Sequence, residues 1–270
     1  YLDDEGYDDS QAARRKFGLW LRHRYGNDLV SLRASWFDGR VTFDDVFVPN
    51  YAKRHGSEND FVRLDRRARR WVDYNLFLSD SLVDRISSIA YAAKSAGEGR
   101  ILVGVSYGYT FEWSHPASGH LSLGKLLRSA EIDYISGPSS YSTRQPGQTA
   151  AFPWPIDSFL LNGKLAVFEE DFRTPIGKSD EDDRLPLMKT PQALEAAHWR
   201  GAGAALAHGG GLNWMDMRGQ GWLNSRGIWE RGSKVLTALN WRVSSPMKDP
   251  DVALMIDERS LAYLADPRAF

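Results

Sequence analysis

Acidic and basic residues follow directly after an apolar segment in residues 163–174, GKLAVFEEDFRT. Glu169 comes straight after the apolar run 165–168, and Asp171 lies two residues further on. Arg173 follows at the same interval, where a guanidinium could hold Asp171 ionised and oriented. Carboxylates in such a position can carry out general acid–base or nucleophilic chemistry. The alternative interpretation is a solvated turn, and Glu170 between the two acids is expected to point away.

Similar side chains follow the other apolar segments of the chain. Carboxylates suit acid–base work and contacts with hydroxyl groups, while Tyr and Trp stack on the faces of sugar rings. These residues therefore predict a carbohydrate site, although a cap, a turn or rim packing is the alternative at each position. The predicted substrate-binding residues are Tyr107, Glu112, Tyr141, Arg144, Asp216 and Trp222.

The predicted elements explain why these residues would come together. Short apolar segments rich in Val, Ile and Leu alternate with helical patterns, which is typical of a parallel sheet with right-handed crossovers. Ligands bind at the carboxyl ends of such strands. Helices are also expected in the first hundred residues, and a long loop at residues 139–157. The strands are predicted at residues 100–109, 132–138, 163–171 and 210–217, and their helices at 118–130, 190–209 and 225–240.

The four strand–helix units allow two α/β architectures. One is an open four-stranded sheet, and the other is half of a (β/α)8 barrel whose remaining strands lie in sequence absent here. Residues 251–264, DVALMIDERSLAYL, follow a linker and resemble the start of another strand–helix unit. We therefore expect one domain over residues 1–245 and the beginning of a second over 246–270.

Composition excludes several functions. The chain has 270 residues, no cysteine and a net charge of −1 from 34 basic and 35 acidic residues, so it carries no general charge for nucleic acid or anionic membrane. No apolar segment is long enough to span a membrane, and the acidic start predicts no signal peptide. Histidines lack metal-binding spacing, and no phosphate-binding loop occurs. We expect no metal and no cofactor, and the compartment, cytoplasmic or secreted, stays open.

Several motifs together resemble the family 42 glycoside hydrolases, the β-galactosidase-like group with (β/α)8 barrels, and their uncharacterised relatives most of all. The resemblance covers nearly the whole chain, and it is more specific for the superfamily than for a substrate. The motifs are KFGLWLRHRYGNDLVSLRASW at 16–36, SYGYTFEW at 106–113, GPSSYSTRQPG at 137–147, GKLAVFEEDFRT at 163–174 and WMDMRGQGW at 214–222.

The resemblance implies that the four strands are the fifth to eighth of the barrel. Glu169 would then be the nucleophile of a retaining glycosidase, and its acid/base glutamate would precede Tyr1, with Glu5 the nearest candidate in this chain. The last segment would enter a flavodoxin-like domain of the kind that mediates trimer formation. The implied partners are a carbohydrate substrate and either a homo-oligomer of the trimer type or a chain that supplies barrel strands one to four.

The chain departs from the family pattern at two positions. Glu170 stands beside Glu169, and the spacing to Asp171 favours Glu169 as the nucleophile. Ser106 replaces an aromatic residue, a change expected to alter packing or the sugar pocket without touching the chemistry. The predicted function is a retaining hydrolase of a β-galactoside-like β-glycoside. The alternatives are a non-catalytic carbohydrate-binding or assembly subunit with half a barrel, and an open doubly wound domain that binds another polar metabolite.

Overall fold

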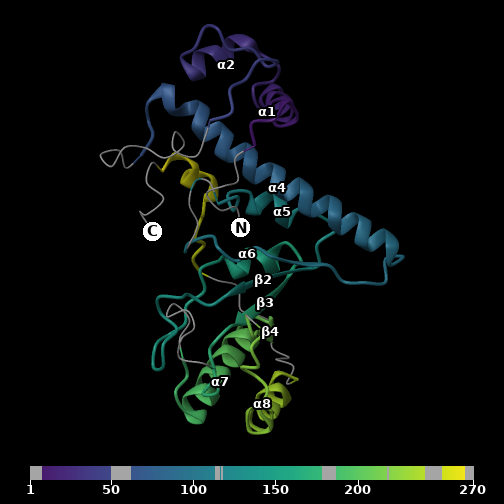
Figure 1. Ribbon diagram of the computed structural model, residues 1–270, viewed down its shortest axis with the longest axis vertical. Coiled ribbons are helices and arrows are strands. Elements are labelled where there is room, and N and C mark those ends of the chain that lie inside the picture. Colours follow the sequence, from purple (N-terminus) through teal and green to yellow (C-terminus); the bar gives the residue numbers. More distant parts are fainter. Residues whose placement is uncertain are drawn as a thin grey trace. The chain divides into compact units, whose positions relative to one another are not determined.

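The computed structural model describes residues 8–49, 62–112, 116, 118–177, 187–217, 219–240 and 251–264 (Figure 1). The chain divides into two compact units. Unit 1 contains Tyr1–Ala92, Thr110–Ser129 and Met255–Phe270, and unit 2 contains Ala93–Tyr109 and Ala130–Leu254. Within the described ranges, no helix has the length and apolar character that crossing a membrane requires.

The described part of unit 1 is built from helices around an aromatic core. Ser10 caps the first helix, because its hydroxyl accepts a hydrogen bond from the backbone N–H of Ala13 at 3.1 Å. Phe17 is fully buried and meets Tyr74 edge to face, with ring centroids 5.1 Å apart. The helices are α1 (Gln11–Arg24), α2 (Leu29–Trp36), η1 (Arg66–Ala68), α4 (Arg69–Ala96), α5 (Leu123–Leu127) and η2 (Glu258–Tyr263).

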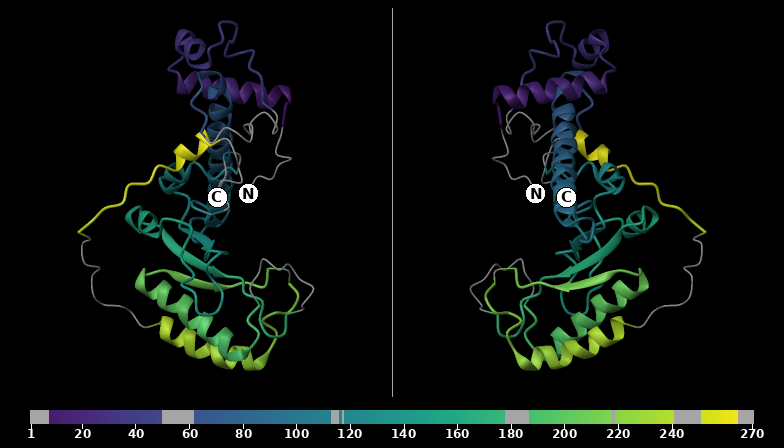
Figure 2. Two further views of the ribbon diagram at one scale, coloured as in Figure 1. Left: turned by 90° about the vertical axis from the view of Figure 1, so that its left-hand side faces the viewer. Right: turned by 90° about the vertical axis from the view of Figure 1, so that its right-hand side faces the viewer.

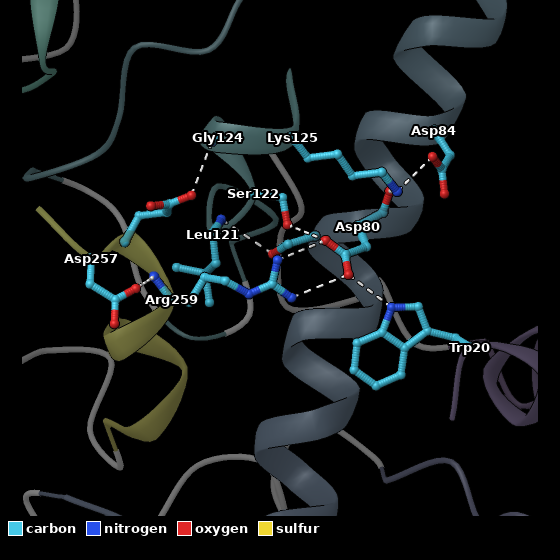
Figure 3. Close-up of polar contacts among 11 residues, drawn as sticks. Trp20, Asp80, Asp84, Leu121, Ser122, Gly124, Lys125, Asp257 and Arg259 are labelled. Carbon is cyan, nitrogen blue, oxygen red and sulfur yellow. Dashed lines mark hydrogen bonds and ion pairs between the residues drawn. The ribbon is translucent and has the colours of Figure 1, made fainter. Parts of the chain in front are cut away.

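Asp80 of α4 connects three other helices of unit 1 (Figure 3). Its carboxylate accepts hydrogen bonds from Trp20 Nε1 at 2.8 Å and Ser122 Oγ at 2.6 Å. Both terminal nitrogens of Arg259 reach it at 3.2 Å. Burial opposes the charged form, but the hydrogen bonds from Arg259, Ser122 and Trp20 outweigh it and hold the pKa of Asp80 below its usual value. Asp80 therefore ties α1, the segment before α5, and η2 to α4.

Within the last described segment, residues 255–264 belong to unit 1. Residues 252–257 are extended and lead into η2, where Ala262 packs against Val72, Leu76 and Leu121. Leu264 then forms an isolated antiparallel bridge with Val62. The predicted domain boundary at residue 245 and the flavodoxin-like domain stay predictions.

Unit 2 contains a four-stranded parallel sheet whose strands lie side by side in chain order. This finding confirms the predicted α/β class with a parallel sheet. Each strand is shorter than predicted. The strands are β1 (Gly104–Ser106), β2 (Tyr134–Pro138), β3 (Leu165–Glu170) and β4 (Gly211–Trp214).

Helices of unit 2 pack on one face of this sheet. Phe168 of β3 lies on that face and contacts Trp154, with ring centroids 5.1 Å apart, while Trp154 in turn stacks on Phe159 of α6 at 5.2 Å. Gly201 of α7 allows a close approach, since a Cβ there would lie 1.8 Å from Oε1 of Glu170. The helices are α6 (Ile156–Leu161), α7 (Pro191–Ala207) and α8 (Arg226–Leu239), and Figure 2 shows α7 and α8 side by side.

The other face of the sheet carries the polar residues of the candidate site. Residues alternate between the faces along β3, so Val167 and Glu169 point away from Phe168 and Glu170. Val167 is in register with Ser136 of β2, and Ser136 is in register with Ser106 of β1. Ser106, Ser136 and Glu169 therefore share one face.

Candidate active site

Glu169 is held by two serines from the neighbouring strands. Its Oε1 accepts hydrogen bonds from Ser136 Oγ at 2.6 Å and from Ser106 Oγ at 3.0 Å, and the two hydroxyl oxygens lie 3.0 Å apart. Oε2 has no hydrogen-bond partner in the described part of the chain, and the side chain is half-buried. One carboxylate oxygen is thus fixed, while the other is left to contact a ligand.

Asp171 lies beyond the end of β3 in a buried ion pair with Arg144. Arg144 Nη1 donates to Asp171 Oδ1, and Tyr141 OH donates to Oδ2 at 3.2 Å. The Arg144 guanidinium lies over the Tyr141 ring, 3.8 Å from its centroid. Within the described residues, Nε and Nη2 of Arg144 are buried without a hydrogen-bond partner. The contacts orient Asp171 and Tyr141 together.

Tyr109 and Tyr141 lie together beside the ion pair of Asp171 and Arg144. Their hydroxyl oxygens lie 3.3 Å apart and their rings are stacked, with centroids separated by 6.5 Å. Burial raises the pKa of Tyr109, and the negative charges of Asp171 and Glu169 raise it further. Burial and Asp171 also raise the pKa of Tyr141. Both phenols therefore stay protonated at neutral pH, and the Tyr141 O–H is the one that donates to Asp171.

Glu170 occupies the opposite face, beneath α7. Burial raises its pKa to about 8, despite a hydrogen bond from Trp214 Nε1 to Oε2 at 3.1 Å. His198 of α7 stacks on Trp214 with ring centroids 4.1 Å apart, and burial lowers the pKa of His198 to about 4. At neutral pH Glu170 and His198 are therefore both uncharged, which suits a packed interior.

Arg173 does not hold Asp171 as expected. The ion pair with Asp171 comes from Arg144, which is distant in sequence, whereas Arg173 is buried and pairs through its backbone with residues 187 and 188. A spacing of two residues indicates proximity only while the chain continues as a strand, and β3 ends at Glu170. The ion-pair partner of Asp171 among the described residues is therefore Arg144, which was predicted as a substrate-binding residue, and not Arg173.

The remaining predicted residues have other surroundings. Tyr107 and Trp222 are each 1% exposed, so neither ring offers a face to a ligand. Asp216 accepts hydrogen bonds from the backbone N–H groups of Gln220 at 3.1 Å, Gly221 at 2.6 Å and Trp222 at 3.0 Å, and thereby folds its own loop. Glu112 belongs to unit 1, and Glu5 lies outside the described residues.

Four residues that contact the site or its loop are not among the predicted site residues. Ser106 was expected to leave the chemistry untouched, yet its hydroxyl contacts Glu169. A polar residue inside each apolar strand was the available signal for Ser106 and Ser136. The signal for Tyr109 was its position shortly after β1. The signal for the fourth residue, Arg200, was a lone charged side chain in the small-residue sequence HWRGAGAAL of α7.

The described residues contain no group of three His, Asp or Glu side chains placed to hold a metal ion. What the site offers is a carboxylate with one free oxygen, two protonated phenols and a buried arginine–aspartate pair. No protein-family model matches the chain, and no curated protein does so either.

Proposed function

We propose that this protein is a retaining glycoside hydrolase that acts on a β-galactoside-like β-glycoside, with Glu169 as its nucleophile. The observation that carries the proposal is the asymmetric environment of the Glu169 carboxylate. Two hydroxyl groups fix Oε1 and leave Oε2 without a partner among the described residues. A nucleophile needs this combination, because a fixed oxygen sets the direction in which the other one attacks.

The reaction would have two displacements. Oε2 of Glu169 attacks the anomeric carbon, and the bond from that carbon to the leaving oxygen breaks while a second carboxylic acid protonates that oxygen. Water deprotonated by the same group then cleaves the glycosyl ester and restores Glu169. Tyr109 would donate a hydrogen bond to a sugar hydroxyl. Tyr141, whose O–H donates to Asp171, would accept a hydrogen bond from one, and Asp171 with Arg144 would fix Tyr141.

We propose further that unit 2 is the second half of a (β/α)8 barrel. Its strands follow one another in chain order without the reversal that marks a doubly wound sheet. Helices α6, α7 and α8 lie on one face, as on the outside of a barrel, and the polar face with Glu169 would line the inside. The missing strands would come from preceding sequence or a partner chain, and residues 246–270 would enter a flavodoxin-like domain of a trimer.

The second carboxylic acid must lie outside the residues described here. In retaining enzymes it is about 5–5.5 Å from the nucleophile. Asp171 is bound to Arg144, Glu170 is on the other face, and Asp216 is bound to three backbone N–H groups. A retaining mechanism at Glu169 therefore requires an acid from the other half of the barrel.

Kinetics of Glu169→Gln in the full-length protein would test the proposal. The amide retains the shape but cannot form the glycosyl ester, so aryl β-galactoside hydrolysis should fall by about 10⁴-fold or more. Glu230→Gln on α8 is the matched control, because Glu230 is exposed and pairs only with Arg226 in the described residues. Undiminished turnover by Glu169→Gln would exclude Glu169 as the nucleophile.

One observation favours a second candidate, a non-catalytic carbohydrate-binding or assembly subunit. Every other carboxylate near the strand ends is bound or turned away, which leaves Glu169 without an acid/base partner in the described residues. A subunit of this kind would bind galactosides in calorimetry and hydrolyse none of them, and Glu169→Gln would weaken that binding.

A further inference from the structure

We propose that Arg200 of α7 is a positioning residue, which fixes the loop of residues 141–148 and thereby delivers Tyr141 and Arg144 to Asp171. The part of this inference that concerns catalysis rests on the proposed glycosidase function. The part that concerns the loop stands on the contacts alone.

Arg200 binds three backbone carbonyl groups of the loop. Its Nη1 donates to the carbonyl oxygen of Gln148 at 2.8 Å and to that of Gln145 at 3.2 Å. Its Nη2 donates to the carbonyl oxygen of Arg144 at 3.1 Å. These partners lie more than fifty positions away in the sequence, so the contacts join α7 to the loop after β2.

The loop transmits this constraint to the site through Arg144. The residue whose carbonyl Arg200 holds is the one whose guanidinium pairs with Asp171 and lies over Tyr141. Both guanidinium carbons, of Arg144 and of Arg200, also lie 5.7 Å from the centroid of the Phe172 ring. One side chain of α7 therefore supports the backbone of the loop, while the adjacent arginine carries the contact to Asp171.

The loop's own hydrogen bonds join residues that are close to one another in the sequence. Gln148 N donates to Gln145 O at 3.0 Å and Ala150 N donates to Thr143 O at 2.7 Å, and the segment between them contains Pro146 and Gly147. Such short-range bonds shape the loop but do not fix its position against α7, which the contacts of Arg200 do. A guanidinium suits the task, because its planar fork presents several N–H groups in fixed directions, whereas a lysine ammonium is a single centre.

The proposal predicts faster amide hydrogen exchange in the loop when the guanidinium of Arg200 is removed. In Arg200→Gln, the amides of Gln148 and Ala150 should exchange at least about tenfold faster, because the carbonyl contacts that restrain the loop are lost. Arg200→Lys should show an intermediate rate and provides a folded variant with the charge retained. Arg226→Gln is the matched control, since Arg226 is 92% exposed and pairs with Glu230 on the same helix.

Kinetics separate a positioning role from general destabilisation. Arg200→Gln should lower kcat/KM by about tenfold in the wild-type background, with partial recovery in Arg200→Lys. In an Arg144→Gln background the same substitution should cause little further loss, because the two residues act through one contact. Full additivity of the two losses would overturn the positioning role.

Hydrogen exchange and kinetics test separate parts of the proposal. Unchanged exchange of the loop in both Arg200 variants would overturn the inference whatever the protein hydrolyses. Faster exchange in a protein that hydrolyses no glycoside would instead leave the loop support standing and refute the proposed function.

Discussion

Glu169 and Glu170 are adjacent in the chain but lie on opposite faces of β3. Glu169 contacts the hydroxyls of Ser106 and Ser136 on the polar face, while Glu170 is buried beneath α7 with Trp214 as its hydrogen-bond donor. Successive side chains of a strand point to opposite faces of the sheet, so the two carboxyl groups are separated although their residues are neighbours in the chain. One of them is therefore available for chemistry, and the other is part of the packed interior.

Ser136→Ala should lower kcat more than Ser106→Ala does. Each substitution removes one hydrogen bond to Oε1 of Glu169, and the bond from Ser136 is shorter, at 2.6 Å against 3.0 Å. A hydrogen bond to a charged group contributes about 1.5–3 kcal/mol, so the loss for Ser136→Ala should be about tenfold or more. Steady-state kinetics on an activated aryl galactoside would measure it.

A serine on the surface provides the control for these variants. Ser233 is exposed on α8, and in the described residues its hydroxyl bonds only to the Glu230 carbonyl, so Ser233→Ala should leave kcat unchanged. Equal activity of Ser136→Ala and Ser233→Ala would show that the serines do not orient Glu169.

Glu170→Gln should remove a pH dependence of stability. The pKa of Glu170 is 4.5 ordinarily and about 8 in the folded protein. Between these values the unfolded chain releases the proton and the folded protein keeps it, so the free energy of unfolding falls as pH rises and levels off above about pH 8. At pH 8 the glutamine variant should be more stable by at least about 1 kcal/mol.

Chemical denaturation at pH 5 and pH 8 would measure this difference. His198 contributes the opposite trend, because its folded pKa of about 4 costs stability as pH falls below its ordinary value. The contribution of His198 is common to both proteins and cancels in the comparison. A stability difference that does not change with pH would contradict the burial of a protonated Glu170.

Asp80→Asn should destabilise unit 1 at neutral pH and not in acid. The carboxylate binds Arg259, Ser122 and Trp20, and its pKa is below 3.8 in the folded protein. The stability that it contributes is present above pH 3.8 and is lost as pH falls through the lower, folded pKa. We expect a loss of about 1–3 kcal/mol at pH 7, measured by denaturation, and convergence with the wild type in acid.

Asp84→Asn tests whether this loss is specific to the Asp80 cluster. Asp84 forms an ion pair with Lys125 at the surface, and its side chain is 67% exposed (Figure 3). Exposed pairs contribute less than about 1 kcal/mol. A loss in Asp84→Asn as large as that in Asp80→Asn would contradict the central role of Asp80.

The spacing of apolar residues predicted most of the helices and strands, and it failed where the segment with that spacing was short. The segments that became β3, α7 and α8 have clear apolar patterns, because each buries one side against the sheet or against another helix. Residues 139–157 were predicted as a loop, and α6 at Ile156–Leu161 was missed. A helix of six residues shows less than two turns of its pattern, so tertiary packing decides its existence.

The candidate site was predictable only in part, for a similar reason. Glu169 and Asp171 follow an apolar strand, which the sequence displays directly. The choice of Arg144 over Arg173 as the partner of Asp171 depends on how the loop after β2 folds back, and Arg200 reaches that loop from α7. Contacts between such distant segments leave no trace in local spacing.

Covalent trapping would show whether Glu169 is the nucleophile. An aryl β-galactoside with fluorine in place of the hydroxyl next to the anomeric carbon, and with an activated leaving group, should form a glycosyl ester that hydrolyses slowly and needs little acid assistance to form. Digestion and mass spectrometry of the full-length protein should place the added sugar on Glu169, and Glu169→Gln should remain unlabelled. A label on any other residue, or galactoside hydrolysis without any label, would contradict Glu169 as the nucleophile.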